Sequence, residues 1–177
     1  MLINNNHSRS RRIALCGIFA ALCLVFLGFG GLTLLDLSIL VVCALMTMLL
    51  VVEAGVRMTW IYAAATSVLA LLLLPSKLYA VEYALFAAVY PILKLYMEKL
   101  PAVAAYPVKI SCLDSMLLLC LVLAQKVFMA GEDYFSLSWI TVGVGTLFFI
   151  LFDVTLSLCI SLYLVKLRKK LGIGRRR

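Results

Sequence analysis

Long apolar runs separated by short charged or proline-containing breaks dominate the chain. The breaks leave six runs, at residues 13–31, 37–52, 58–74, 80–97, 107–128 and 137–165. Each run is close to the roughly 20 apolar residues that a helix needs to cross a bilayer core about 30 Å thick. The pattern therefore predicts an all-α, polytopic membrane protein with six transmembrane helices.

The composition agrees with this prediction. Of the 177 residues, 66% are hydrophobic, which leaves too little polar surface to cover a water-soluble globule. The first run follows a basic stretch, as in a signal peptide, but it has no clear small-x-small cleavage site, so we expect it to be retained. The expected organisation is a basic tail at 1–12, a six-helix transmembrane domain at 13–165 and a second basic tail at 166–177.

The distribution of positive charge predicts the orientation. An even number of spans puts both ends on one side, and cytoplasmic loops are enriched in Lys and Arg. With both termini cytoplasmic, 14 of the 16 basic residues fall on the inner side, which leaves only Lys77 and Lys126 outside. We therefore expect a multi-pass protein of the bacterial inner (plasma) membrane. The net charge of +8 then reflects topology and attraction to anionic lipid, and no polar domain is present that could read nucleic acid.

The stretch YPILKLYMEKLP, residues 90–101, forms the predicted cytoplasmic connection between the fourth and fifth spans. Pro91 lacks an N–H and predicts a kink near Ala87. Lys94 and Lys99 are expected to extend to the inner headgroups. Two interpretations stay open: a positively anchored helix end, or a docking surface for a partner protein.

The first span carries small residues on one helix face. Ala14, Gly17 and Ala21 recur at spacings of three and four residues, which aligns them along the helix. Small residues let helices approach closely in lipid, where association depends on packing. This face could bind another subunit or pack within the chain itself.

The layout and the stretch ALCGIFAAL resemble the substrate-binding (S) component of energy-coupling factor (ECF) transporters. In that family an Ala-x-x-x-Ala pattern on the first span packs against a transmembrane coupling subunit, and Gly17-x-x-x-Ala21 would be the match here. The resemblance implies a solute-binding subunit for uptake of a small molecule such as a vitamin or precursor. Coupling and ATPase subunits would be supplied by other chains.

The predicted outer side carries more acids than bases. The acids Asp36, Glu82, Glu132 and Asp133 outnumber Lys77 and Lys126, so this side should modestly favour cationic or zwitterionic solutes. Aromatic residues lie beside the acids, and Tyr83 and Trp139 are candidates for stacking against a solute. The alternative is an ordinary outer boundary, where aromatic belts are common and bases are rare.

Two acids lie inside predicted spans. Asp114 is close enough to Lys109 to reach inner-side water or a basic neighbour, and we interpret it as a paired structural carboxylate. Asp153 lies thirteen residues before Lys166, roughly 20 Å from that anchor. A carboxylate at that depth must be protonated, paired with a residue of another span, or bound to a solute. Asp153 is therefore a candidate substrate ligand or one partner of a buried pair.

Enzymatic chemistry finds little support in the sequence. The only histidine, His7, lies in the amino-terminal tail, and all six cysteines fall inside predicted spans without a Cys-x-x-Cys motif. We predict no catalytic site, metal or cofactor in this chain. The alternative to a transport subunit is a small structural membrane protein that organises the envelope or a multiprotein complex.

Overall fold

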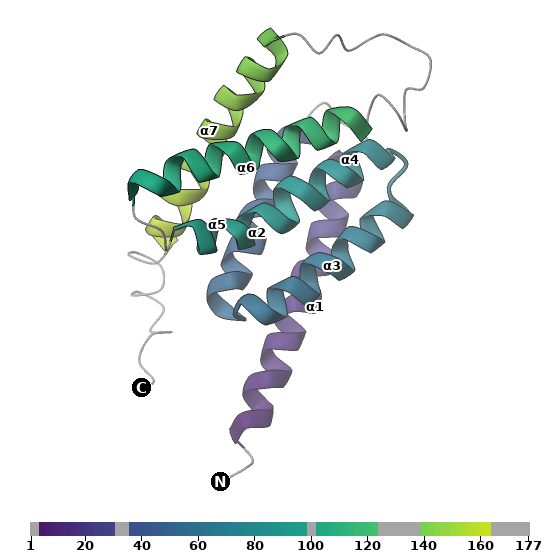
Figure 1. Cartoon of the computed structure of the whole chain (residues 1–177). Helices are drawn as coiled ribbons and strands as arrows, with labels where there is room; N and C mark the ends of the chain where they lie inside the picture. The colour runs from purple at the N-terminus through teal and green to yellow at the C-terminus, as the bar shows by residue number, and fades with distance from the viewer. Residues whose placement is uncertain (1–3, 31–35, 99–101, 124–138, 164–177) are drawn as a thin grey trace.

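The computed structural model of the protein describes residues 4–30, 36–98, 102–123 and 139–163, with only the backbone described at 4–9, 102–106 and 139–142. These residues form seven α-helices and one π-helix and contain no strand (Figure 1). The elements are α1 (Asn4–Gly30), α2 (Asp36–Glu53), α3 (Val56–Leu73), α4 (Lys77–Glu82), the π-helix η1 (Tyr83–Val89), α5 (Tyr90–Met97), α6 (Ala102–Leu123) and α7 (Trp139–Leu162). The prediction of an all-helical protein is confirmed.

Five segments of the described chain are long and apolar enough to cross a membrane. They are Ser10–Gly30, Asp36–Glu53, Val56–Leu73, Lys77–Met97 and Gly143–Leu162. In the most apolar stretches of the first and last segments only 17% of residues are buried, against 56% in Lys77–Met97. The chain is therefore a membrane protein in which the segment formed by α4, η1 and α5 is central and α1 and α7 are peripheral.

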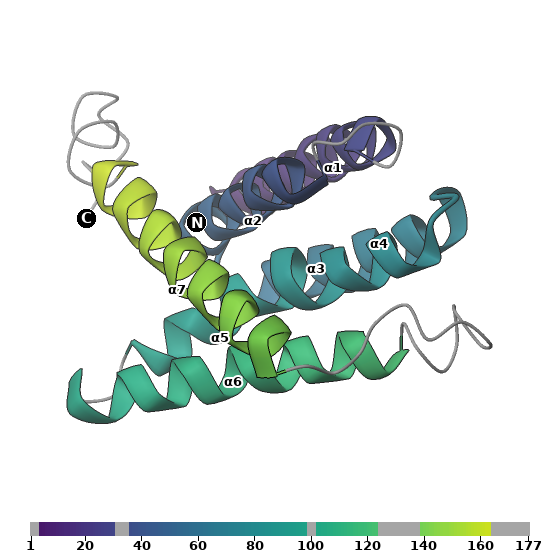
Figure 2. The same ribbon diagram turned by 90° about the horizontal axis from the view of Figure 1, so that it is seen from above.

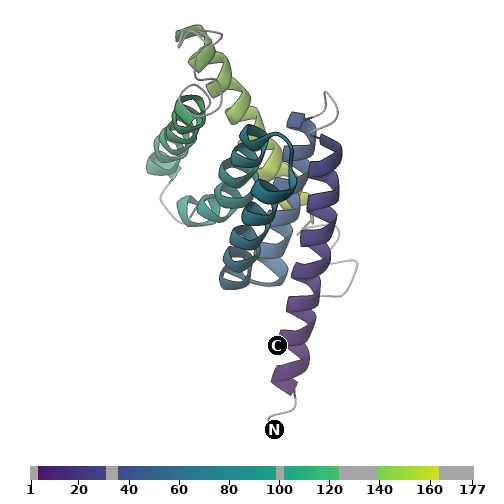
Figure 3. The ribbon, with the colours of Figure 1, turned by 90° about the vertical axis from the view of Figure 1, so that its right-hand side faces the viewer.

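The helices pack around that central segment. Helix α1 contacts α2 and α3, both α2 and α3 contact η1, and α7 contacts α2 and α6. Figure 3 shows α1 alongside α2, with the amino-terminal end of α1 extending beyond the other helices. Seen from above in Figure 2, α7 crosses α5 at a steep angle. This crossing brings the middle of α7 to the end of α5.

The turn between α2 and α3 depends on one glycine. Gly55 has φ 89°, a conformation that L side chains rarely adopt. The N–H groups of Ala54 and Gly55 both donate to the carbonyl of Leu50, and the carbonyl of Gly55 accepts from the N–H of Thr59. The backbone is thus satisfied from one helix into the next, as a low-dielectric environment requires.

The predicted kink near Ala87 falls within a π-helix that ends just before Pro91. The seven residues Tyr83–Val89 form a π-helix, and the N–H of Tyr90 donates to the carbonyl of Leu85, five residues earlier. Pro91 follows in the first turn of α5, and as a proline it has no N–H to donate to the preceding turn. The helical segment thus continues from the wider π turn through the proline without a break.

Two glycines of α1 have contrasting surroundings, and they predict opposite responses to an added methyl group. A Cβ at Gly30 would overlap the hydroxyl of Tyr79 and lie 3.2 Å from Ile39 Cδ1, whereas a Cβ at Gly17 would meet nothing within 4 Å. We expect Gly30→Ala to destabilise the protein by about 1–3 kcal/mol through overpacking. Gly17→Ala should be neutral or stabilising by up to about 1 kcal/mol. Thermal unfolding of both variants in one detergent tests this, and equal losses would contradict the packing described.

Candidate functional site

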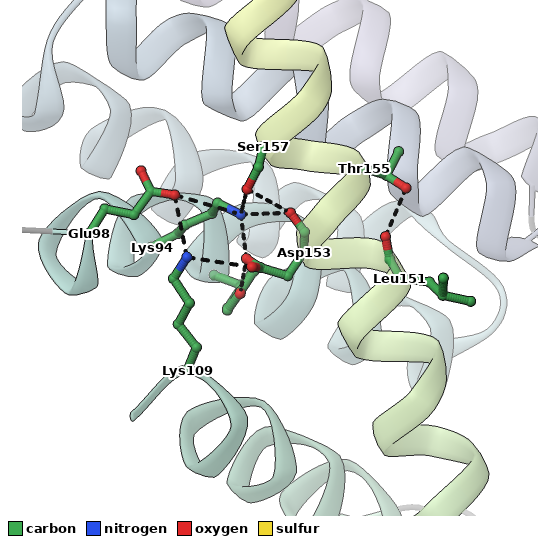
Figure 4. Close-up of polar contacts among 8 residues, drawn as sticks. Lys94, Glu98, Lys109, Leu151, Asp153, Thr155 and Ser157 are labelled. Atoms are coloured by element: carbon green, nitrogen blue, oxygen red, sulfur yellow. Dashed lines mark hydrogen bonds and ion pairs between the residues drawn. The ribbon is translucent and has the colours of Figure 1, made fainter. Parts of the chain in front are cut away.

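A fully buried lysine lies where α5 meets α7. The side chain of Lys94 has no solvent exposure, and its Nζ donates to the Asp153 carboxylate, to the Asp153 carbonyl at 2.7 Å and to Ser157 Oγ at 2.7 Å (Figure 4). An ammonium group has three N–H donors, and each has an acceptor here. All three N–H donors of Lys94 therefore bond to groups within one turn of α7.

Two further charges close the arrangement into a ring. Lys109 Nζ lies 3.4 Å from Asp153 Oδ2 and 3.4 Å from Glu98 Oε1, and Lys94 Nζ lies 3.8 Å from Glu98 Oε1. We call Lys94, Glu98, Lys109 and Asp153 the charge ring. Each lysine contacts both acids, and two bases with two acids give a formal charge of zero. The ring joins α5, α6 and α7.

Helical spacing explains how single elements contribute several groups. Tyr90, Lys94 and Glu98 are four residues apart, which places them on one face of the segment through α5. The hydroxyl of Tyr90 donates to Asp153 Oδ1. On α7, Ser157 lies one turn after Asp153 and donates back to its carbonyl at 3.0 Å. One face of the segment through α5 and one turn of α7 thus provide most of the polar contacts around the charge ring.

Burial differs around the charge ring. The exposed side-chain fraction is 0% for Lys94, 12% for Lys109 and 15% for Asp153, but 41% for Glu98. Attraction between opposite charges strengthens as the dielectric constant falls, and removal of one partner leaves a buried charge uncompensated. The Lys94–Asp153 pair is therefore the tightly held part of the ring, and Glu98 is its exposed edge.

The structure corrects the expectation for Lys94. The sequence predicts that this side chain extends to the headgroups or to a partner surface, but the ammonium is buried against α7. The reason is the depth of Asp153, whose carboxylate needs a counter-charge that its own helix does not supply. Lys99, the other lysine of the predicted docking surface, lies outside the described residues.

The structure shows which groups compensate the negative charge of Asp153. Of the three expected means, the structure shows a pairing with residues of other helices, namely Lys94, Lys109 and Tyr90. The assignment of Asp153 as a substrate ligand stays a prediction. Sequence reasoning named none of these three partners. The spacing of Tyr90, Lys94 and Glu98 was a visible signal of a polar face, but it did not reveal which helix that face would contact.

Asp114, which we interpreted as a paired structural carboxylate, has a hydroxyl partner on α7. Its Oδ1 accepts a hydrogen bond from Thr146 Oγ1 at 2.9 Å. This bond connects the middle of α6 to the first half of α7. Asp114 thus contributes to the same helix pairing as Lys109 and Asp153.

Two of the predicted solute residues lie at the opposite end of the central segment from the charge ring. Asp36 begins α2 and Glu82 ends α4. The hydroxyl of Tyr79 donates to the Asp36 carbonyl at 3.2 Å, which ties the two helices together. Asp36 Oδ1 is buried without a hydrogen-bond partner among the described residues. We call Asp36 and Glu82 the acid pair.

The remaining predicted solute residues do not join the acid pair in the described structure. Tyr83 is fully buried, and its hydroxyl donates to Thr66 Oγ1 at 2.8 Å while it accepts from Cys23 Sγ at 3.4 Å. These bonds connect η1 to α3 and α1. Trp139 begins α7, and its side chain is not among those described.

The small-residue face of α1 is open. Ala14, Gly17 and Ala21 are all exposed, while Cys23 and Leu27 on another face of the helix are fully buried in the core. The described chain therefore does not use the small-residue face for its internal packing. We call Ala14, Gly17 and Ala21 the small-residue ridge.

Comparison of the chain with protein-family models, with curated proteins and with solved structures finds no match. The described residues also contain no group of three or more His, Cys, Asp or Glu side chains that could hold a metal ion.

The charge ring predicts a specific pattern of mutant stabilities. Asp153→Asn removes the counter-charge of a fully buried ammonium, so it should destabilise the protein by about 3–5 kcal/mol. The double variant Lys94→Met, Asp153→Asn should recover part of that loss because no buried lysine is left unpaired. Thermal unfolding in detergent is the measurement.

Thr155→Val is the matched control for these variants. Thr155 lies on the same helix, but it is exposed and its hydroxyl bonds only to the Leu151 carbonyl of its own helix (Figure 4). Its replacement should leave the melting temperature almost unchanged. A double variant that is no more stable than Asp153→Asn would show that the Lys94 charge is not the cause of the loss.

Proposed function

We propose that the chain is the membrane-embedded solute-binding subunit of an energy-coupled uptake transporter in the bacterial plasma membrane. In this proposal α6 is the fifth of six spans and α7 the sixth, and both termini are cytoplasmic. A transmembrane coupling subunit and ATPase subunits are separate chains. The observation that carries the proposal is the small-residue ridge, which α1 leaves open along its membrane-spanning part.

Contacts between helix ends support the proposed topology. The hydroxyl of Tyr163 at the end of α7 donates to Glu53 Oε1 at the end of α2, at 2.8 Å. The hydroxyl of Tyr79 near the start of α4 contacts Asp36 at the start of α2. Six alternating spans would put the first pair of groups at the cytoplasmic side and the second pair at the outer side. Both contacts therefore agree with six spans.

The small-residue ridge has the features of a helix-docking surface. A Cβ built at Gly17 meets no atom within 4 Å, so the backbone of another helix can approach it closely. The exposed side chains of Arg11 and Arg12 precede the ridge on the same helix. A coupling subunit that packs here would contact small side chains in the membrane and positive charge at its surface.

The acid pair supports a cationic or zwitterionic solute. Asp36 and Glu82 place two carboxylates at the proposed outer side, and one oxygen of Asp36 is buried without a partner among the described residues. A protonated amine would supply a counter-charge and satisfy the buried oxygen. An amine-bearing small molecule is therefore the solute class that we propose.

Bulk on the small-residue ridge should uncouple the subunit without unfolding it. In the variant Gly17→Leu, Ala21→Leu, added side chains would prevent close approach of a partner helix but would leave an insertable apolar span. We expect normal expression and melting temperature, with loss of co-purifying coupling subunit and ATPase activity. Co-purification from native membranes, followed by an ATP hydrolysis assay, measures both.

Ala64→Leu serves as the control because Ala64 is also an exposed alanine in a membrane-spanning helix, on α3. It should keep the partner. Retention of the coupling subunit by the ridge variant would contradict the proposed docking face. Co-purification of envelope-synthesis proteins without an ATPase would favour the structural role instead.

Loss of charge from the acid pair should weaken solute binding more than folding. Asp36→Asn and Glu82→Gln keep the side-chain shapes but remove the attraction for an amine. Native mass spectrometry of the purified complex should detect an amine-bearing small molecule in the parent protein and less of it in both variants. Ser38→Ala, an exposed position of α2 next to this end, is the control. Equal occupancy in parent and variants would remove the acid pair from the proposed site.

A further inference from the structure

Five uncharged polar side chains converge in the core between α1, α2, α3 and η1. Cys23 Sγ donates to the Tyr83 hydroxyl at 3.4 Å, and that hydroxyl donates to Thr66 Oγ1 at 2.8 Å. The thiol of Cys43 and the hydroxyl of Tyr62 lie next to the Cys23 thiol. Each of the five residues is at most 3% exposed. We call Cys23, Cys43 and Tyr62 the thiol cluster.

The thiol cluster lies well inside the membrane. Cys23 is the fourteenth of the 21 residues of Ser10–Gly30, and Cys43 is the eighth of the 18 residues of Asp36–Glu53. Each cysteine is at least seven residues, or about 10 Å, from either end of its segment. The packing of α1 against α2 brings the two thiols together. Because they come from separate helices, no short cysteine motif announces them in the sequence.

The hydroxyl of Tyr62 is the incomplete part of the thiol cluster. It is buried without a hydrogen-bond partner among the described residues. A buried hydroxyl that donates to nothing costs free energy, and the hydrocarbon core has no water to satisfy it. The sulfur of Cys23 is a weak acceptor as a thiol, whereas a thiolate is a charged and stronger one. The surroundings of Tyr62 therefore favour a deprotonated sulfur.

A thiolate at this depth needs a positive charge, and the described side chains place none beside it. Two of the described lysines belong to the charge ring, and Lys77 donates to carbonyls at the end of α3. The arginines with described side chains are exposed near the starts of membrane-spanning segments. A metal ion can provide the charge, because its coordination to sulfur displaces the thiol proton.

The ligands indicate which ion would bind. Thiolates select Cu(I), zinc or iron–sulfur clusters, whereas Mg²⁺ and Ca²⁺ need several oxygen ligands. Zinc sites take at least three protein ligands and iron–sulfur clusters usually take four cysteines. The described residues bring only two sulfurs together here. Cu(I) is the soft ion that two thiolates can hold without a further strong ligand.

We propose that Cys23 and Cys43 bind one Cu(I) ion. Both thiols release their protons to the aqueous phase, both sulfurs become ligands, and the copper stays monovalent. The complex carries one net negative charge, which a hydrogen bond from the Tyr62 hydroxyl to a ligating sulfur stabilises. This site is separate from the acid pair and does not rest on the proposed transport function.

A copper titration tests the proposal. The purified full chain is kept reduced and free of oxygen in detergent, and Cu(I) is supplied as its coloured bicinchoninate complex. The parent protein should remove one equivalent of Cu(I) from the chelator. Cys23→Ser and Cys43→Ser should each lower the affinity by at least about 100-fold, because a hydroxyl is not a soft ligand.

Cys120→Ser is the matched control. Cys120 is also a buried cysteine in a helix, at 6% exposure, but it lies on α6 and outside the thiol cluster. It should bind Cu(I) as the parent does. A parent that takes up no Cu(I), or equal affinity in the parent and both cluster variants, would overturn the proposal. A Cys23–Cys43 disulfide in protein that binds no copper would assign the pair to redox chemistry instead.

Tyr62→Phe keeps the test informative if the serine variants do not fold. It removes a hydroxyl that has no partner, so the metal-free protein should keep or raise its melting temperature. Its affinity for Cu(I) should fall by about 10- to 100-fold, because a group that supports a ligand is lost. A lower melting temperature with unchanged copper affinity would show that the hydroxyl supports the fold and not a metal site, which contradicts the proposal.

Discussion

A fully buried ammonium group constrains the second half of this protein. In a low-dielectric interior Lys94 must have a counter-charge, and the carboxylate that provides it lies on α7. This requirement fixes the middle of α7 against the end of α5, and Lys109 brings α6 to the same point. The crossing of α7 over α5 in Figure 2 is the geometric result.

The first half of the chain is held together differently. In its core the polar contacts are neutral: Tyr83 of η1 bonds to Thr66 and Cys23 of two other helices. The buried threonines bond to carbonyls one turn earlier in their own helices. Neutral hydrogen bonds satisfy polar groups within the membrane without placing a charge there. The molecule thus combines a neutral core around η1 with a charged contact at α5, α6 and α7.

The π-helix links these two halves. It lies between Glu82, which belongs to the acid pair, and Tyr90, which bonds to Asp153. A π turn contains more residues than an α turn, so it changes the direction in which later side chains point. Pro91, which has no N–H to donate to the preceding turn, lies in the first turn after the π-helix. In the proposed function, the solute end and the charge ring are therefore two ends of one continuous segment.

The sequence by itself determined the properties that depend on composition and local order. The apolar runs predicted helices, and the breaks near Gly55 and before Lys77 coincide with the observed helix ends. The spacing of Ala14, Gly17 and Ala21 placed them on one face because helical periodicity is local. The depth of Asp153 likewise followed from its distance along the chain to the basic tail.

Only the tertiary structure decided which groups meet. Lysine side chains are long enough to reach either headgroups or a neighbouring helix, so sequence position could not show that Lys94 is buried against Asp153. The ridge on α1 could equally have packed inward, and its exposure depends on which other face of α1 carries Cys23 and Leu27 into the core. Pairings between helices depend on crossing angles and rotations that many distant residues set together, and no single stretch of sequence contains them.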